Sequence, residues 1–176
     1  MVEMAKIIFV SGAHGVGKTT FCRQIKHQLA LPHYSSSSLI KAHGQFDELS
    51  KLSTNADDKQ LILLDALDKI AAPTVILDGH FCLLNSKGLV IEIKDSIYHR
   101  MKPSVIIVVT CPPDVVHQRL LYRDKNSFPV DLIEEMQTKE MRKASRIAQQ
   151  LNIPLLEYKS ASDIEALVKN VVSLKI

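Results

Sequence analysis

The segment from Gly12 to Thr19 reads Gly-Ala-His-Gly-Val-Gly-Lys-Thr and matches the pattern G-x-x-x-x-G-K-[ST]. An apolar run of strand length precedes it and a segment of helical periodicity follows it, which is the context in which the pattern has meaning. Glycines allow the backbone to turn so that successive N–H groups point at phosphate oxygens, and the N-terminus of the following helix adds partial positive charge. The segment therefore predicts a phosphate-binding loop between a strand and a helix.

The residue types in the loop indicate ATP with Mg²⁺ as the bound cofactors. Lys18 is expected to reach the β- and γ-phosphates, and the hydroxyl of Thr19 is expected to bind Mg²⁺, which prefers hard oxygen ligands. The Thr20 hydroxyl either contacts the α-phosphate or belongs to an ordinary first helical turn. At its variable position in the loop, His14 fits a solvated side chain better than a catalytic one. The predicted cofactor-binding residues are Gly12, Ala13, His14, Gly15, Val16, Gly17, Lys18, Thr19 and Thr20.

Composition narrows the class of protein. The 176 residues, 46% of them hydrophobic, suffice for one domain over residues 1–176 with a sizeable core. A net charge of +3 from 22 basic and 19 acidic residues is too balanced for a nucleic-acid scaffold. No apolar run approaches the roughly 20 residues of a membrane span, nothing resembles a secretion signal, and the three cysteines form no metal-binding spacing. We expect a cytoplasmic enzyme without nucleic-acid or membrane partners, as a monomer or small homo-oligomer.

Apolar runs alternate with helical segments, which predicts a parallel sheet covered by helices on both faces. The fold class is thus α/β: a P-loop NTPase fold with a five-stranded parallel sheet in a three-layer αβα arrangement. The predicted strands are Lys6 to Val10, Pro32 to Tyr34, Thr74 to Leu77, Ser104 to Thr110 and Pro154 to Tyr158. The predicted helices are Lys18 to Leu29, Ser38 to Leu49, Asp57 to Ala71, Leu89 to Arg100, Pro112 to Tyr122, Asp131 to Gln150 and Ser162 to Leu174.

Further segments resemble the adenylate kinase superfamily of P-loop nucleoside monophosphate kinases, above all its small, short-lid archaeal-type members. The run from Pro32 to Lys41 is similar to the segment with which that family begins its acceptor-binding helices, here about residues 35–71. The resemblance implies substrate-binding roles for Ser36 and Ser37 near the acceptor and for Lys41 near its phosphate. The family's usual Gly-Asp is Ser37-Ser38 here and its usual arginine is Lys41, which lacks the bidentate grip of a guanidinium.

The strand from Val75 to Leu77 ends in Asp78-Gly79-His80, which resembles the family's Asp-Gly or Asp-Thr-His. The resemblance implies that Asp78 holds Mg²⁺, through water, or orients the attacking oxygen, and that His80 contacts substrate. The alternative is an aspartate that only caps a turn.

Arg119 and Arg123 resemble the family's R-x-x-x-R at the entry to a lid, here the short segment 124–130 with no structural metal. Their i, i+4 spacing places both on one helix face, and a closing lid would bring them onto ATP. The alternative is a solvated basic helix edge. Arg142 matches an arginine that the family directs at the transferred phosphate, although Lys139, Lys143 and Arg146 lie close by. The resemblance therefore implies Lys18, Asp78, Arg119, Arg123 and Arg142 as the catalytic residues.

Three functions remain open at this point. The first is an ATP-dependent kinase of nucleoside or nucleotide monophosphates, and the second is a kinase of a non-nucleotide metabolite, which the missing acceptor arginine favours. The third is an ATPase or nucleotide-dependent switch with a macromolecular partner. In the first two cases the partner is a small-molecule phosphoryl acceptor.

Overall fold

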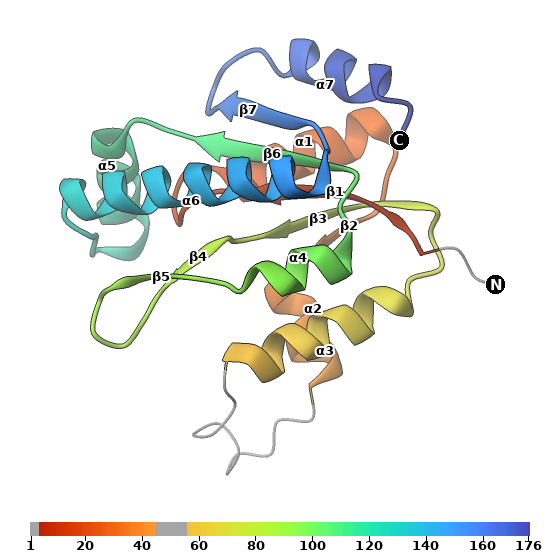
Figure 1. The fold of residues 1–176 in the computed structure, drawn as a ribbon. Helices are drawn as coiled ribbons and strands as arrows, with labels where there is room; N and C mark the ends of the chain where they lie inside the picture. Colours follow the sequence, from red (N-terminus) through yellow and green to blue (C-terminus); the bar gives the residue numbers. More distant parts are fainter. Residues whose placement is uncertain (1–3, 45–55) are drawn as a thin grey trace.

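The computed structural model describes residues 4–44 and 56–176, and Figure 1 shows a central sheet with helices packed around it. The sheet has five strands in the order β2-β3-β1-β6-β7, and all neighbouring strands are parallel. The predicted α/β fold with a five-stranded parallel sheet is therefore confirmed. The strands are β1 (Lys6–Ser11), β2 (His33–Ser35), β3 (Thr74–Gly79), β6 (Val105–Thr110) and β7 (Leu155–Lys159).

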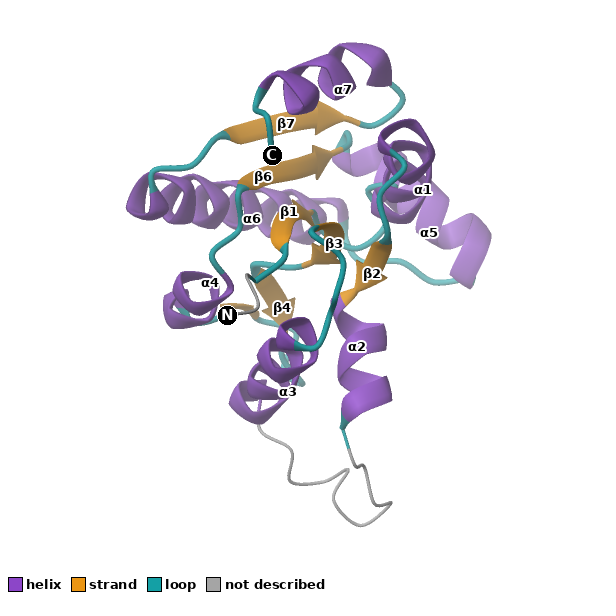
Figure 2. Cartoon of the chain, turned by 90° about the vertical axis from the view of Figure 1, so that its right-hand side faces the viewer, coloured by secondary structure: helices purple, strands orange, loops and turns teal. Residues whose placement is uncertain are grey.

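Helices cover both faces of the sheet, because alternate residues of its buried strands supply two separate apolar cores (Figure 2). Ile7 and Phe9 of β1 point into the core that packs against α3, α4 and α6. Ile8 and Val10 point into the core that packs against α1, α5 and α7. The helices are α1 (Lys18–Leu29), α2 (Ser36–His43), α3 (Ala56–Asp68), α4 (Asp95–Met101), α5 (Pro113–Asp124), α6 (Val130–Leu151) and α7 (Ile164–Ser173).

One predicted element is wrong in its first half. The helix expected from Leu89 to Arg100 begins only at Asp95, and the residues before it form β5 (Val90–Glu92), paired antiparallel with β4 (Cys82–Leu84). Asn85 explains the difference, because its Oδ1 accepts hydrogen bonds of 2.9 Å from the N–H groups of Lys87 and Leu89. With Gly88 at a φ of 74°, this tight turn reverses the chain into a hairpin.

The two helices predicted between β2 and β3 are present, but their ends differ from the prediction. The helix expected from Ser38 begins at Ser36, and the predicted residues 45–49 lie outside the described part of the chain. The expected Asp57 to Ala71 helix is α3, which ends at Asp68.

The strand register places the predicted functional segments at one edge of the sheet. Val10 and Ser11, which precede the loop, pair with Asp78 and Gly79, and Ser35 also pairs with Asp78. The carboxyl ends of β1, β2 and β3 therefore meet, which is where open α/β sheets bind ligands.

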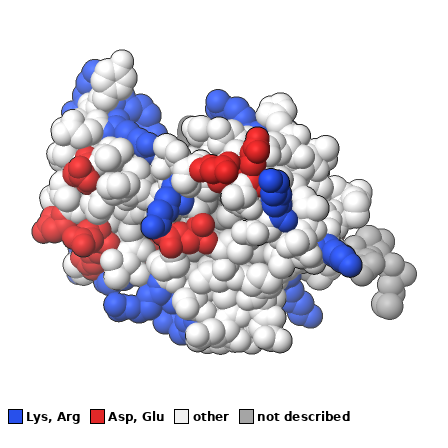
Figure 3. All heavy atoms as spheres, turned by 90° about the horizontal axis from the view of Figure 1, so that it is seen from above, with Lys and Arg blue, Asp and Glu red and all other residues white. Residues whose placement is uncertain are grey.

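The surface has charges of both signs. On the face seen in Figure 3, blue and red side chains are interspersed rather than gathered into one broad area of a single sign. Of the helices in the described ranges, none has the length and apolarity needed to cross a membrane.

Candidate active site

The phosphate loop has the backbone that its sequence predicted. Gly15 and Gly17 adopt φ angles of 85° and 97°, in the left-handed region that favours glycine. The Lys18 side chain turns back across the loop, and its Nζ donates a 3.1 Å hydrogen bond to the carbonyl oxygen of Gly12. Burial lowers the pKa of Lys18, while the charges of Asp78 and Glu140 raise it in opposition. The ammonium is thus held inside the loop, where phosphate would be expected.

A cavity of about 580 Å³ opens on this loop, and we call it the phosphate-loop cavity. It brings together most of the predicted cofactor-binding residues, whereas Gly12 and Val16 lie behind it as buried parts of the loop. Seven further lining residues come from α1, α5 and the segment around the end of β7: Phe21, Gln24, Leu120, Tyr122, Tyr158, Ser160 and Ala161. The predicted residues in the lining are Ala13, His14, Gly15, Gly17, Lys18, Thr19, Thr20, Arg119 and Arg123.

Both predicted lid arginines reach this cavity from one face of α5. Arg119 Nη1 donates to the carbonyl oxygen of Val16 at 3.3 Å and to Ser160 Oγ at 3.2 Å. Arg123 forms an ion pair with Asp124 and lies 3.1 Å from His14 Nε2. Burial and the Arg123 charge lower the pKa of His14, so its ring is a neutral partner near neutral pH. Two arginines of α5, just before the segment 124–130, therefore contact the phosphate loop directly.

A second cavity, of about 270 Å³, lies at the carboxyl ends of β2 and β3, and we call it the serine cavity. Its polar lining includes Ser36, Ser37, Asp78 and His80, the predicted substrate-binding residues with the exception of Lys41. Ser36 Oγ donates a 2.7 Å hydrogen bond to the carbonyl oxygen of Asp78, which fixes the start of α2 against the end of β3. Apolar residues complete the walls: Phe9, Ile40, Leu63, Leu83, Ile93, Tyr98 and Met101.

Two predicted cations lie elsewhere. Lys41 is exposed on α2 and is absent from the described lining of the serine cavity, to which α3 instead contributes Lys59 and Gln60. Arg142 is exposed on α6 and lines none of the cavities found among the described residues, and its role stays a prediction. The sequence missed Lys59 because a lysine on a polar helix face carries no motif of its own.

The two cavities approach each other at His80. His80 Nε2 lies 3.4 Å from Lys18 Nζ, and a third cavity of about 160 Å³ shares His14 with the phosphate-loop cavity and His80 with the serine cavity. Burial and the Lys18 charge lower the pKa of His80 to about 4, so its imidazole is neutral at neutral pH. A neutral imidazole can accept a hydrogen bond from the ammonium of Lys18.

Helix α6 fixes this region through two polar side chains that the sequence analysis did not assign. Glu140, only 1% exposed, accepts hydrogen bonds of 2.8 and 2.9 Å from the N–H groups of Phe81 and Cys82, directly after His80. One turn earlier, Gln137 binds both the N–H and the carbonyl group of Cys111, after β6. Burial raises the pKa of Glu140, although these N–H groups act in the opposite direction. The sequence signal that could have identified Gln137 and Glu140 was a polar pair at i, i+3 on the buried face of an amphipathic helix.

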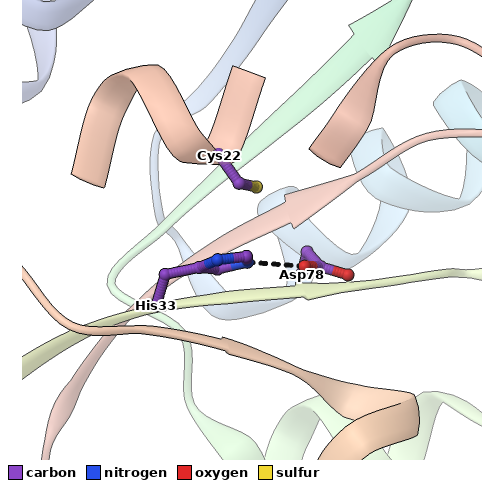
Figure 4. Close-up of side chains that lie close together, drawn as sticks. All are labelled: Cys22, His33 and Asp78. Atoms are coloured by element: carbon purple, nitrogen blue, oxygen red, sulfur yellow. Dashed lines mark hydrogen bonds and ion pairs between the residues drawn. The ribbon is translucent and has the colours of Figure 1, made fainter. Parts of the chain in front are cut away.

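Asp78 has a partner that the sequence did not reveal. Its Oδ2 lies 2.6 Å from Nε2 of His33, which is on the neighbouring strand β2 and two register positions away (Figure 4). The side chains of His33 and Asp78 are 19% and 16% exposed. The carboxylate is therefore held at the edge of the serine cavity in a fixed orientation.

Oxygen donors suitable for Mg²⁺ are present at the loop. Thr19 is exposed to the phosphate-loop cavity, and Asp78 is the next-to-last residue of the adjacent strand. A hydroxyl and a carboxylate are the hard ligands that Mg²⁺ takes together with phosphate oxygens. These two residues fit the predicted metal role.

Comparison with known proteins gives consistent results. The sequence profile described as "AAA domain" matches residues 11–137. The chain is 28% identical over 144 residues to adenylate kinase isoenzyme 1 of Oryctolagus cuniculus, covering 76% of this chain and 72% of that protein. It is 27% identical over 155 residues to cytidylate kinase of Pyrobaculum islandicum, covering 85% of this chain and 77% of that protein.

Among solved structures, shikimate kinase from Bacteroides thetaiotaomicron is similar with a TM-score of 0.58 and 19% sequence identity. The match covers 98% of this chain and 99% of that one. At this identity the likeness shows a shared fold.

Proposed function

The chain belongs to the AAA domain family of P-loop proteins, and from this premise we propose that it is an ATP-dependent kinase of adenylate-kinase type that phosphorylates a small molecule. The relatives of this chain include adenylate and cytidylate kinases. ATP would occupy the phosphate-loop cavity and the acceptor would occupy the serine cavity.

The observation that carries this proposal is the approach of the two cavities at Lys18 and His80. Phosphoryl transfer needs donor and acceptor oxygens roughly in line, with little covalent chemistry for the protein to perform. A protein that only hydrolysed ATP would need no second cavity with polar groups beside the loop. Here Asp78 and His80 face that second cavity while Lys18 faces the first, at a separation of 3.4 Å between His80 Nε2 and Lys18 Nζ.

Each named residue has a physical role in this proposal. Lys18 would stabilise the negative charge that spreads over the transferred phosphoryl oxygens, and Arg119 and Arg123 would add positive charge from the lid side. Asp78, oriented by His33, would accept a hydrogen bond or proton from the attacking oxygen of the acceptor. Thr19 and Asp78 would hold Mg²⁺, which would supply positive charge to offset that of the phosphates.

The leading acceptor is a nucleoside monophosphate. The relatives named above support it, and so does the polar end of the serine cavity, where hydroxyls from the start of α2 lie in the same lining as the Lys59 ammonium. An ammonium attracts phosphate as a point charge, whereas a guanidinium binds it through two hydrogen bonds.

A non-nucleotide metabolite is the second candidate, and one observation favours it. No arginine occurs in the sequence between Arg23 and Arg100, and among the described residues none lines the serine cavity. An acceptor with a phosphate would therefore meet no guanidinium here, although a guanidinium fits the geometry of phosphate best. A hydroxylated acceptor without a phosphate would make no such demand.

The test is a screen of purified protein with ATP and Mg²⁺ against nucleoside monophosphates and small hydroxylated metabolites, with product detection by mass spectrometry. We expect one acceptor class to be phosphorylated and a Lys18→Ala variant to be inactive on it. ATP hydrolysis that no acceptor accelerates, with no phosphorylated product, would contradict the kinase function and favour an ATPase.

A further inference from the structure

A cysteine, a histidine and an aspartate from three different elements meet beside the phosphate loop. Cys22 lies on α1, His33 on β2 and Asp78 on β3, and Figure 4 shows the side chains of His33 and Asp78 directed at each other with Cys22 close by. The ligand atoms that they offer all lie within 4.8 Å of one another. In residues 4–44 and 56–176 this is the one group of three or more such side chains close enough to share an ion.

The three donor types indicate which metal the group would take. Thiolate and imidazole are borderline-soft donors that select Zn²⁺ and similar transition metals, whereas Mg²⁺ prefers oxygen donors alone. Three protein ligands leave the fourth tetrahedral position of Zn²⁺ to water, as in sites where the ion is reachable from solvent.

The pair of His33 and Asp78 needs only a small movement to accept an ion between them. His33 Nε2 and Asp78 Oδ2 are 2.6 Å apart in a hydrogen bond, whereas two ligands on one tetrahedral zinc ion, each about 2.0 to 2.2 Å from it, lie roughly 3.3 Å apart. The ion would therefore replace that hydrogen bond after a separation of under about 1 Å. His33 and Asp78 retain some exposure, so an ion has access, while Cys22 forms the buried end.

We propose that Cys22, His33 and Asp78 form a binding site for Zn²⁺ or a similar divalent transition metal, and that an ion bound there withholds Asp78 from the acceptor. Burial and the nearby Asp78 carboxylate raise the pKa of the Cys22 thiol, so the metal-free thiol is protonated and its proton leaves when the sulfur binds the ion. The binding site stands on its geometry alone. Its inhibitory effect rests on the proposed kinase function.

Calorimetric titration of metal-free protein with zinc chloride tests the site without any activity assay. We expect one ion per chain, with Cys22→Ser and His33→Gln each weakening binding by more than about 10-fold, since even indirect partners of a metal ligand contribute that much. Cys111→Ser is the matched control, because Cys111 is also a buried free cysteine but lies outside the trio. Cobalt titration adds a readout, because thiolate–cobalt absorption should appear in the parent and in Cys111→Ser and be missing in Cys22→Ser.

Activity measurements then test whether the bound ion inhibits the enzyme. Micromolar zinc should inhibit the parent and the Cys111→Ser control, while Cys22→Ser should keep the parent's activity and resist the inhibition. Zinc binding by the parent no tighter than by folded Cys22→Ser, with no thiolate–cobalt band, would overturn the site. Metal binding that meets the expectation in a protein that phosphorylates no acceptor would instead overturn the kinase function and leave the site standing.

Discussion

The phosphate-loop cavity and the serine cavity lie on either side of Lys18 and His80 but are assembled differently. The first takes most of its predicted residues from one continuous segment, 13–20, and adds two arginines from α5. The second collects small groups of residues from β1, the end of β2, α2, α3, the end of β3, β4 and α4.

This difference has a chemical meaning. Triphosphate binding by backbone N–H groups needs a fixed loop geometry, so its residues must be consecutive in sequence. An acceptor cavity needs only a shape and a few polar groups, which can come from any element that reaches it. The phosphate-loop cavity, the donor half of the site, is thus constrained by local sequence. The serine cavity, the acceptor half, is free to vary in specificity.

The largest expected effect lies in the donor half. Lys18→Ala should lower kcat on the order of 10³-fold, because the lysine's charge acts on the phosphoryl group in the transition state. Steady-state kinetics would measure the loss, with circular dichroism as the control for folding. A folded Lys18→Ala variant that turns over as fast as the parent would show that the loop does not serve phosphoryl transfer.

Asp78→Asn tests the acceptor half and should lower kcat on the order of 10²-fold, because an amide cannot take a proton from the attacking oxygen. The variant keeps the size of the side chain and can still hydrogen-bond to His33. The affinity for ATP, measured by calorimetry, should change little. If the kcat for the acceptor were unchanged while ATP affinity fell, Asp78 would belong to the donor half.

His80, at which the two cavities approach each other, should make the stability of the protein depend on pH. The pKa of His80 is about 4 in the folded protein and ordinarily 6.5, so between these values only the unfolded state binds the proton. Stability should therefore fall as the pH falls, by about 2 kcal/mol from pH 7 to pH 5 on account of His80.

The raised pKa of Glu140 works in the other direction, because its native state takes up a proton before the unfolded state does. Urea unfolding at both pH values, in the parent and in His80→Asn, isolates His80, since both proteins keep Glu140. Equal pH dependence in the two proteins would contradict the neutral, buried imidazole.

Two lysines compare the prediction from sequence with the structure. Lys41 was predicted beside the phosphate of the acceptor, whereas Lys59 lines the serine cavity. If the acceptor carries a phosphate, Lys59→Ala should lower kcat/KM for it by about 10-fold, the loss of one charged contact, whereas Lys41→Ala should have a smaller effect. ATP affinity should be unchanged in both. A larger effect of Lys41→Ala than of Lys59→Ala would support Lys41 as the phosphate contact. No effect of either variant on any monophosphate would favour the uncharged metabolite.

The smallest expected effect concerns the lid. Binding of ATP together with acceptor should slow hydrogen exchange in residues 119–131, because Arg123 must leave Asp124 to reach phosphate and the segment must close over the site. Residues in β6, already buried, serve as the internal reference. Unchanged exchange in residues 119–131 with both substrates bound would argue that the arginines are a solvated helix edge.

The sequence by itself determined the sheet and the phosphate loop. Buried parallel strands must be continuous apolar runs, and the loop must place its glycines and lysine at fixed spacing, so both are written in consecutive residues. The hairpin of β4 and β5 was missed because its pairing depends on the Asn85 turn rather than on a strong strand pattern.

Only the tertiary structure decided which side chains complete the site. Packing across elements brings His33 against Asp78, Glu140 against the backbone after His80, and Lys59 into the serine cavity. His33 is 45 positions from Asp78 in the sequence, and Glu140 is 59 positions from Phe81. No local periodicity encodes such a pair, because it is the docking of helices on the sheet that sets the distance between them.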